Sequence, residues 1–376
     1  MKVLHVTTVI QTAKAFLLPY AASFQSKGWQ VDIATNIGND FSLENHKNTY
    51  HIDFSRRPID FISHIKSFFQ MRKLVKNNSY NIVHVHTPIA SLITRFALIG
   101  ISETKVFYTA HGFHFIEGNS KILNFFYILL EKVAGLCTDH LFVINEHDYK
   151  SALRYKIVPE ICLSRLYGIG VNVEVYKHNE SLRRLTRDEI GINDDSVCIL
   201  HIAELNKNKN QMIVLSAINK IISNNMTMKN FVYVVVGDGL LKEELVNYTI
   251  ENGIERYIMF LGYRNDIPEL LSASDIVSLS SFREGLPRCL LEAMCNEKPI
   301  LASDIRGCKD LLKTGAGLLA SPDSKTEWAL NLLKMIESSE LQKTCGKKGR
   351  DLVTSHYREC SVIDQVLSVY EQKGDI

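Results

Sequence analysis

Short apolar segments alternate with helix-length segments along this chain, and the alternation occurs in two successive series. The strand-like segments of the first series are residues 3–7, 30–35, 82–86, 105–109 and 140–144. Those of the second series are residues 196–203, 231–236, 257–261, 276–280 and 299–302. Helix-length stretches lie between them, notably 16–28, 60–77 and 211–224. This alternation predicts parallel sheets covered by helices, and two doubly wound, Rossmann-like α/β domains in tandem.

The boundary between the two predicted domains falls in the polar stretch 171–195. We place the N-terminal domain at residues 1–172 and the C-terminal domain at residues 173–357. Residues 356–373 have the pattern of one helix, and we expect the segment of about 358–376 to pack back on the first domain. Since parallel sheets bind ligands beyond the carboxyl ends of their strands, the loops there should carry the chemistry.

The charge of the chain excludes binding to nucleic acid by bulk attraction, because 43 basic and 41 acidic residues leave a net charge of only +2. The halves differ, however. The first 176 residues hold 18 basic and 13 acidic side chains, which suits an anionic surface better than the second half does.

Eight cysteines without a C-x-x-C pair indicate reduced thiols in a cytoplasmic protein. The N-terminus has no signal-peptide pattern. The most apolar stretch, residues 122–137, is too short to span a bilayer. We therefore expect a cytoplasmic protein that can still lie on a membrane.

Two glutamates flank the start of a predicted helix in the second domain. Glu284 lies in the loop before the helix, Pro287 fits its first turn, and Glu292 lies about a turn and a half inside. Free amides of the first turn and the helix dipole suit a diphosphate, and both carboxylates can accept hydrogen bonds from hydroxyls. The alternative is that Glu284 only caps the helix and Glu292 is solvated.

This segment resembles the E-x7-E motif of the family-4 retaining glycosyltransferases, both in its spacing and in its surroundings at residues 281–287 and 291–294. The resemblance implies the GT-B fold, two facing Rossmann-like domains with a cleft between them, and metal-independent transfer without a cofactor. It assigns Glu284 to hydroxyls of the donor sugar and Glu292 to the ribose. The amides near four further residues are expected to meet the sugar and the diphosphate: Gly285, Leu286, Leu290 and Leu291.

A lysine-rich loop follows the first strand of the second series. The resemblance assigns Lys209 to the donor diphosphate, with Lys207 as the second choice. Glu204 stands where the family usually has an arginine, and Lys207 or Arg288 is expected to supply the missing charge. A solvated polar loop is the alternative.

Two histidines lie on a glycine-containing loop after the strand 105–109. The family carries a histidine on this loop that faces the reacting centre, and His111 matches it, while we expect His114 on the acceptor side. Because this His-x-x-His has no neighbouring Asp or Cys ligands, we expect no metal.

Two further loops of the second domain are assigned to the nucleotide. Gly237 and Gly239 form a tight turn after a strand, and in the family a similar turn borders the nucleotide. A simple turn is the alternative. The resemblance places Tyr263 and Arg264 against the nucleobase, which in most similar enzymes is uracil.

The first loop, residues 7–16, lacks the glycines that many family members use to approach the donor phosphates. We therefore expect its side chains to face the acceptor, with Thr8, Gln11 and Lys14 as the candidates.

The first domain also carries basic residues interleaved with aromatic ones, at residues 56–76 and 121–132. Basic residues beside exposed aromatics suit a peripheral membrane contact. The alternative is that the aromatic side chains belong to the core. The resemblance favours the contact, because the first domain binds the acceptor and lipid-linked acceptors are common in the family.

The sequence thus predicts a retaining glycosyltransferase that moves a hexose or N-acetylhexosamine from a UDP-sugar to a lipid-linked saccharide. The resemblance places this reaction in the synthesis of a bacterial capsule, exopolysaccharide or O-antigen. Two alternatives stay open. One is a GT-B nucleotide-sugar epimerase. The other is a non-catalytic partner subunit, supported only by Glu204 and by the missing glycine of the first loop.

Overall fold

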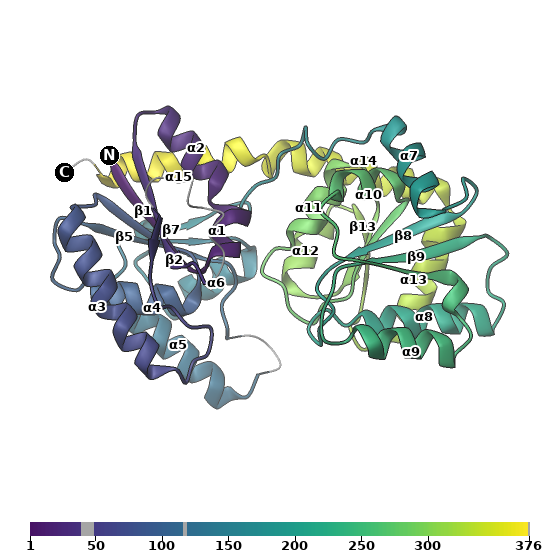
Figure 1. Cartoon of the computed structure of the whole chain (residues 1–376), viewed down its shortest axis with the longest axis horizontal. Coiled ribbons are helices and arrows are strands. Elements are labelled where there is room, and N and C mark those ends of the chain that lie inside the picture. The colour runs from purple at the N-terminus through teal and green to yellow at the C-terminus, as the bar shows by residue number, and fades with distance from the viewer. Residues whose placement is uncertain (39–48, 116–118, 375–376) are drawn as a thin grey trace. The chain divides into compact units, whose positions relative to one another are not determined.

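A computed structural model describes residues 1–38, 49–115 and 119–374 of the chain (Figure 1). The chain forms two compact units. The first comprises Met1–Gly170 together with Glu359–Ile376, and the second comprises Val171–Arg358. These limits differ by one or two residues from the predicted ones.

The first unit is built on a parallel sheet of seven strands in the order β3-β2-β1-β4-β5-β6-β7. β1 is central, with Val3 opposite Val31 on β2 and Ile82 on β4. The strands are β1 (Lys2–Val9), β2 (Gln30–Asn36), β3 (Thr49–His51), β4 (Ile82–Val85), β5 (Lys105–Ala110), β6 (His140–Val143) and β7 (Leu163–Arg165). Near-continuous runs of buried Val, Ile and Phe explain why the sheet is covered on both faces.

Helices cover both faces of this sheet and enclose two apolar cores. They are α1 (Ile10–Phe16), α2 (Leu18–Ser26), α3 (Phe61–Asn78), α4 (Pro88–Ala97), α5 (Lys121–Gly135), α6 (Glu146–Tyr155) and α15 (Glu359–Gly374). Adjacent strand residues face opposite cores: Tyr108 packs with Met71 of α3, whereas Phe107 packs with Phe24 of α2 and Tyr370 of α15. Figure 1 shows α3, α4 and α5 side by side on one face.

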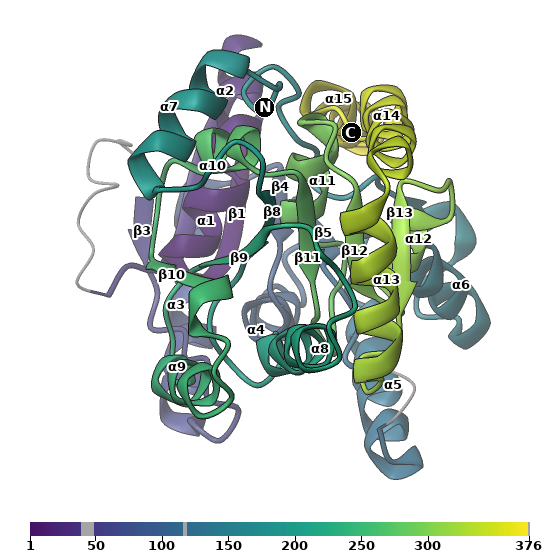
Figure 2. The same cartoon turned by 90° about the vertical axis from the view of Figure 1, so that its right-hand side faces the viewer.

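The second unit is built on a parallel sheet of six strands in the order β10-β9-β8-β11-β12-β13. The strands are β8 (Val197–Ile202), β9 (Phe231–Val236), β10 (Ile258–Gly262), β11 (Ile276–Leu279), β12 (Ile300–Ser303) and β13 (Gly317–Ala320). The helices are α7 (Glu180–Ile190), α8 (Gln211–Ser223), α9 (Lys242–Glu251), α10 (Ile267–Ala273), α11 (Arg288–Cys295), α12 (Arg306–Leu312), α13 (Lys325–Glu337) and α14 (Ser339–His356). Figure 2 shows α8 and α9 on one face of the sheet, and α10, α11 and α14 on the other.

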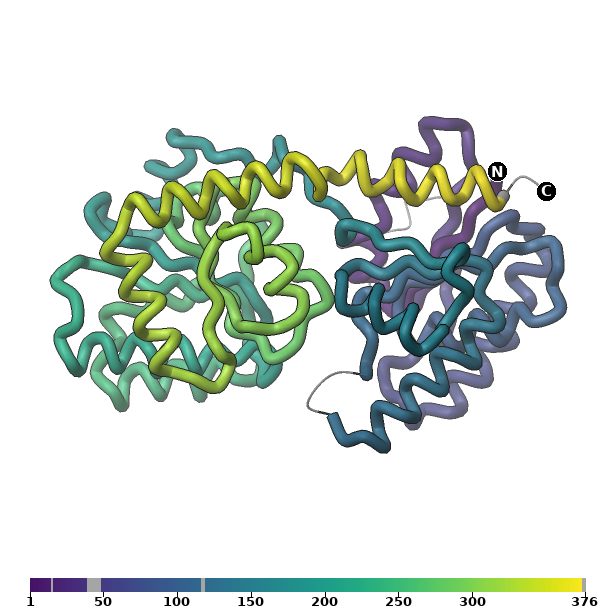
Figure 3. The backbone as a smooth tube through the Cα atoms, turned by 180° about the vertical axis from the view of Figure 1, so that it is seen from behind, coloured from purple at the N-terminus to yellow at the C-terminus, as the bar shows by residue number. Residues whose placement is uncertain are grey.

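Two predicted helices are wrong in their limits. Residues 16–28 do not form one helix, because the helical segment begins earlier and divides into α1 and α2 at Leu17. Residues 356–373 are also not one helix. α14 ends at His356, and α15 begins at Glu359 and packs on α2 in the first unit (Figure 3). The break lies where the chain leaves the second unit, and there Tyr357 accepts a hydrogen bond from the amide of Val171 at 2.9 Å.

All eight cysteines are free thiols, and Cys360 is exposed. In the described part of the chain, no helix combines the length and the apolar character needed to cross a bilayer.

Candidate active site

The predicted diphosphate lysine and the first predicted glutamate contact each other at the carboxyl edge of the second sheet. Lys209 Nζ donates a hydrogen bond of 2.6 Å to Glu284 Oε1, and Ser281 Oγ donates another of 2.6 Å to the same oxygen. Burial is the largest single influence and lowers the pKa of Lys209, but the charge of Glu284, the hydrogen bond to it and the nearby Cys289 and Cys308 together raise this pKa by more. A cation and a carboxylate are therefore held together, with both side chains partly exposed.

Backbone contacts connect the two loops that carry this pair. The amide of Phe282 donates to the carbonyl of Asn208 at 2.7 Å, and Asn208 Nδ2 donates to the carbonyl of Arg283 at 3.1 Å. Ser280 Oγ also donates to the carbonyl of Lys209 at 2.7 Å. The loops after β8 and β11 thus form one platform. The predictions missed Asn208 and Ser281, because only the fold brings these distant loops together.

The loop that follows β12 also contacts the backbone of Glu284. Arg306 Nε donates to the carbonyl of Glu284 at 3.3 Å. A Cβ atom on Gly307 would lie only 2.4 Å from the carbonyl oxygen of Gly285, so the close approach requires glycine there. No local sequence signal marked Arg306 and Gly307 as supports of the site.

Glu292 is nearly buried on α11 and forms an ion pair with Arg288 one turn earlier, at 2.9 Å. Burial raises the pKa of the Glu292 carboxyl, and the charge of Arg288 and a hydrogen bond from Tyr176 offset part of that effect. The expected role of Arg288 as a spare phosphate cation therefore competes with this pair. Lys207, the other candidate, is exposed.

The first turn of α11 differs slightly from the prediction. Pro287 precedes the helix, which begins at Arg288, and the amide of Leu290 already donates to the carbonyl of Pro287 at 3.2 Å. The Leu290 amide thus already has a backbone partner, and its contact with the donor stays a prediction. The side chains of Leu290 and Leu291 are buried and anchor the helix, whereas Gly285 and Leu286 are half-buried in the loop before it.

The two glycines after β9 are needed for close packing. A Cβ on Gly237 would lie 2.0 Å from the carbonyl oxygen of Ala203, and one on Gly239 would lie 2.4 Å from that of Leu205. Both glycines also have positive φ angles. They therefore hold the turn against the start of the loop that carries Lys207 and Lys209.

The predicted nucleobase residues follow β10. Tyr263 is 75% exposed, which leaves its ring available for stacking. The guanidinium of Arg264, in contrast, is paired with Asp266 and with Glu189 of α7. These contacts use Nε and Nη2 of the guanidinium and hold the side chain towards the two carboxylates.

In the first unit, a cluster of neutral histidines extends from the middle of strands β1 and β4 to the carboxyl edge of the sheet. His5 Nδ1 and His86 Nε2 share a hydrogen bond of 3.0 Å, and the rings of His84 and His86 lie 4.1 Å apart. His111 follows β5 and stacks on Phe16 at 5.7 Å. Burial lowers the pKa of His111 to about 4, so its imidazole is neutral at physiological pH.

A hydrogen-bonded chain connects this cluster to the C-terminal helix. The hydroxyl of Tyr370 on α15 bonds to His84 Nδ1, and His84 Nε2 bonds to Thr109 Oγ1 at 2.7 Å. Thr109 lies two residues before His111. No sequence pattern pointed to Tyr370, which is 286 residues away from its partner His84.

The remaining acceptor-side candidates are spread over the same edge. The segment expected to be a loop is mostly α1, with Gln11 exposed and Lys14 partly buried on it. Thr8 is buried, and its hydroxyl is bonded to Thr87 Oγ1 at 2.6 Å, which favours a structural role. His114 is exposed, with its ring 5.5 Å from that of Tyr127.

Among the described residues, one group has ligand atoms close enough for a metal ion, namely His5, His84 and His86. Most of their nitrogens are already hydrogen-bonded: His5 Nδ1 and His86 Nε2 bond to each other and both nitrogens of His84 bond to hydroxyls, whereas His5 Nε2 is buried without a partner among the described residues. This arrangement fits a hydrogen-bonded stack better than a set of metal ligands.

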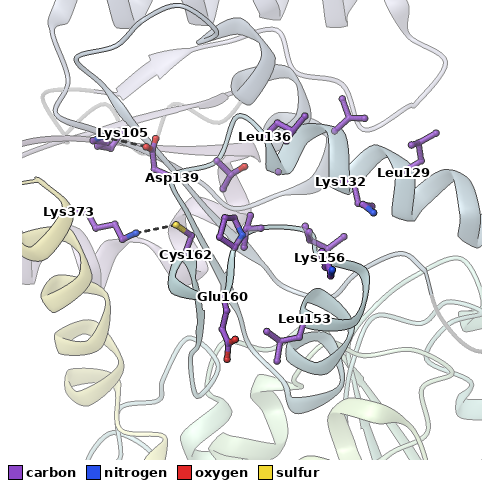
Figure 4. Close-up of a pocket in the computed structure, with 16 residues that line it drawn as sticks. Lys105, Leu129, Lys132, Leu136, Asp139, Leu153, Lys156, Glu160, Cys162 and Lys373 are labelled. Carbon is purple, nitrogen blue, oxygen red and sulfur yellow. Dashed lines mark hydrogen bonds and ion pairs between the residues drawn. The ribbon is translucent and has the colours of Figure 1, made fainter.

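A hollow of about 1160 Å³ opens in the first unit between the ends of α5 and α6 (Figure 4). Within the described part of the chain, its lining includes none of the predicted site residues. Its lysines include Lys132 and Lys156, near the carboxyl ends of these helices, where cations complement the helix dipoles. It therefore lies at the edge of the sheet opposite the site loops.

Comparison with known families agrees with this arrangement. Residues 183–352 match the model of the group 1 glycosyl transferases, and residues 5–142 match that of the glycosyl transferase 4-like proteins. The two matches fall in the second and the first unit respectively.

Individual relatives cover all or most of the chain. It is 30% identical over 379 residues to a Bacillus subtilis protein named as a glycosyltransferase, EpsD, covering 100% of this chain and 97% of that protein. It is 28% identical to the Escherichia coli UDP-Gal:alpha-D-GlcNAc-diphosphoundecaprenol alpha-1,3-galactosyltransferase, covering 84% and 81% of the two chains.

Solved structures show the same fold. HepE of Anabaena in complex with UDP superposes with a TM-score of 0.82 at 19% identity, over 99% of this chain and 100% of the other. Sucrose-phosphate synthase of Thermosynechococcus elongatus gives 0.83 at 15% identity, over 99% and 98%. The identity over the full length, the two domain matches and this fold show that the chain belongs to the family-4-like glycosyltransferases of the GT-B fold.

Proposed function

We propose that this protein is a retaining, metal-independent glycosyltransferase that moves a hexose or N-acetylhexosamine from a UDP-sugar to a lipid-linked saccharide. The reaction would extend a bacterial surface polysaccharide at the cytoplasmic face of the membrane. The observation that carries the donor half of this proposal is the contact between Lys209 and Glu284 on one platform.

That contact suggests how a donor is engaged. A diphosphate is a stronger partner for Lys209 than one carboxylate, since it carries more negative charge. When Lys209 turns to the diphosphate, Glu284 is released to accept hydrogen bonds from sugar hydroxyls. Lys209 then stabilises the negative charge that develops on the leaving UDP in the transition state.

Two relatives support the acceptor class. The printed name of the Escherichia coli relative specifies a diphosphoundecaprenol-linked acceptor and a UDP-sugar donor. A Campylobacter jejuni relative, 32% identical over 167 residues, is also named for an undecaprenol-linked saccharide. Both names describe those proteins, and we extend the class of acceptor to this chain.

Exposed apolar side chains on the first unit support membrane contact. α3 exposes Phe61, Ile62, Ile65 and Phe69, and α5 exposes Ile122, Phe125, Phe126, Leu129 and Val133, with the exposed Leu136 directly after it. Lys66, Lys73 and Lys76 lie among the apolar side chains of α3. Helices of this kind bind anionic membrane surfaces. Of the two sequence-based alternatives, the structure thus favours exposure over the core for most of these aromatic side chains.

The donor is tested first, by ligand-observed NMR in EDTA with UDP, GDP, ADP and a panel of UDP-sugars. We expect saturation transfer to uridine and to one sugar. Incubation of that UDP-sugar with diphosphoundecaprenol-linked saccharides should then give an α-linked product, recognised by its small H1–H2 coupling. Glu284→Gln should abolish transfer, whereas the exposed control Glu251→Gln should not.

The results separate the alternatives. A β-linked product would contradict retention, and an absolute requirement for added Mg²⁺ would contradict metal independence. Binding of GDP or ADP in place of UDP would contradict only the proposed nucleobase, uracil. Absence of all nucleotide binding would favour a non-catalytic subunit, and release of an epimer without acceptor would favour an epimerase.

A further inference from the structure

A second hollow of the first unit lies at the carboxyl edge of its sheet. It has a volume of about 640 Å³ and opens beside β1, β2 and the segment that leads from β3 to α3. Its lining includes Gln11, Asn36, Asp53, Arg56, Arg57 and Ser63. Gln11 is one of the residues predicted to face the acceptor, so this hollow is on the side of the sheet where the acceptor is expected.

The two arginines give this hollow its charge. Neither guanidinium has a side-chain partner among the residues that the structure describes. Two carboxylates also line the hollow, but neither is paired with an arginine: Asp53 is paired with Lys66 at 2.9 Å and accepts from Gln70 at 2.6 Å, and Asp60 accepts from the amide of Ser63 at 3.3 Å. Two adjacent guanidiniums without an ion-pair partner among the described residues present planar donor arrays that match phosphate oxygens.

Exposed apolar side chains begin immediately after these arginines. Ile59 precedes α3, and Phe61, Ile62 and Ile65 lie in its first two turns, with exposed fractions between 61% and 83%. Ser63 and Asp60 of the same segment line the hollow. A polyanion site thus adjoins an apolar surface, which is the pattern that an amphiphile with a phosphorylated head requires.

We propose that this hollow binds the diphosphate of the lipid-linked acceptor, with Arg56 and Arg57 as its ligands. The lipid then leaves over the apolar side chains of α3, and the saccharide extends from the diphosphate towards Gln11. This inference rests on the proposed function, since it specifies how that acceptor is held. It also makes the diphosphate a determinant of specificity, because an acceptor without one leaves both guanidiniums unpaired.

The experiment uses the full-length protein with farnesyl diphosphate as the probe and saturating UDP present, so that the donor site does not take up the probe. Arg56→Gln/Arg57→Gln should weaken farnesyl diphosphate binding at least roughly tenfold, since each charge-assisted contact is strong. Farnesol should bind the variant and the parent equally. The matched control, Lys73→Gln/Lys76→Gln, removes two exposed charges of α3 beyond the hollow and should leave the affinity within twofold of the parent.

Several results would overturn the inference. Equal loss of affinity in the control would show a general effect of charge, and an unchanged affinity in the arginine variant would place the diphosphate elsewhere. Displacement of the probe by dihexanoyl phosphatidylglycerol at equal concentration would show an unspecific lipid contact. UDP binding is measured separately, so failure of the proposed donor class appears as loss of UDP binding, whatever the probe does. Circular dichroism confirms that each variant is folded.

Discussion

The two sheets carry opposite kinds of chemistry around their central strands. In the second unit the loops there hold charged pairs, Lys209 with Glu284 and Arg288 with Glu292. In the first unit the central strands and the loops after them hold histidines, of which His5, His86 and His111 are kept neutral by burial. The lining of the hollow with Arg56 and Arg57 includes none of these histidines. The same α/β architecture thus supports a charged donor site in the second unit and a neutral histidine cluster in the first.

This difference fits the proposed division of labour. A leaving diphosphate needs fixed positive charge near it, whereas a sugar and an acceptor hydroxyl need hydrogen-bond partners that do not alter the net charge. A neutral imidazole supplies such a partner, because one nitrogen donates and the other accepts. Charge and neutrality are therefore the properties by which the two units can be told apart experimentally.

The largest expected difference is the response of the two units to acid. Burial lowers the pKa of His5 to about 3 and those of His111 and His140 to about 4, and it lowers those of His84 and His86 well below the ordinary value. In acid these histidines bind protons in the unfolded chain but stay neutral in the folded first unit. The free energy of unfolding of this unit therefore falls as the pH falls below about 6.5. Each such histidine costs about 1.4 kcal/mol one pH unit below that value.

The second unit should respond less. Among its described residues, His201 is the histidine with a lowered pKa, and the raised pKa of Glu292 acts in the opposite direction, since it favours the folded state in acid. Trp29 reports on the first unit and Trp328 on the second. Urea unfolding of Trp29→Phe and Trp328→Phe, at about pH 7.5 and about pH 5.5, measures each unit separately. Equal losses in both units would remove the contrast.

Lys209→Met tests the charged site itself. Because the ammonium is the cation that we expect to meet the leaving diphosphate, its loss should lower kcat by roughly 10²- to 10³-fold. Lys207→Met is the matched control on the same loop and should lower kcat only a few-fold. The measurement is the initial rate of UDP release with acceptor present. A larger effect at Lys207 than at Lys209 would reverse the assignment.

Gly307→Ala tests whether the platform must be rigid. The new Cβ would meet the carbonyl oxygen of Gly285 at 2.4 Å and must displace the loop that carries Glu284. A shift of about 1 Å near the reacting groups can lower the rate by up to about 10²-fold, so we expect a loss of roughly tenfold or more in kcat. Gly349→Ala on α14 is the control, since its closest neighbour is the flexible side chain of Met294. Similar rates for both variants would show that the loop tolerates the shift.

The local hydrophobic pattern of the sequence predicted most strands of both sheets. All ten predicted strands are present, because each is an apolar run bounded by polar residues, and all except β10 are mostly buried. The three missed strands, β3, β7 and β13, have only three or four residues and lie at or next to a sheet edge, where hydrophobic pattern is weak. The break between α14 and α15 was missed for another reason, since tertiary contacts of the crossing chain decide it.

In the candidate active site, too, the sequence predicted residues that lie in motifs but not the partners that only the fold brings to them. Glu284 and Lys209 were found from their spacing and their resemblance to a family motif, and the fold joins them. The pairing of Arg264 with Glu189 was not predictable, because the two residues are 75 positions apart and neither lies in a motif. Tyr176 and Tyr370 are further cases in which only the folded chain reveals the partner of a site residue.

The smallest predicted effect concerns the neutral site. Tyr370→Phe removes the hydroxyl that bonds to His84, and leaves a buried imidazole nitrogen without that partner. The free energy of unfolding of the first unit should fall by about 1–3 kcal/mol, as measured by Trp29 fluorescence in Trp328→Phe. Because His84 also bonds to Thr109 beside His111, kcat should fall a few-fold, while the affinity for UDP, which we assign to the second unit, should not change. Weaker UDP binding would instead mean that the two edges are not independent, and the contrast between a charged and a neutral site would then describe one coupled centre.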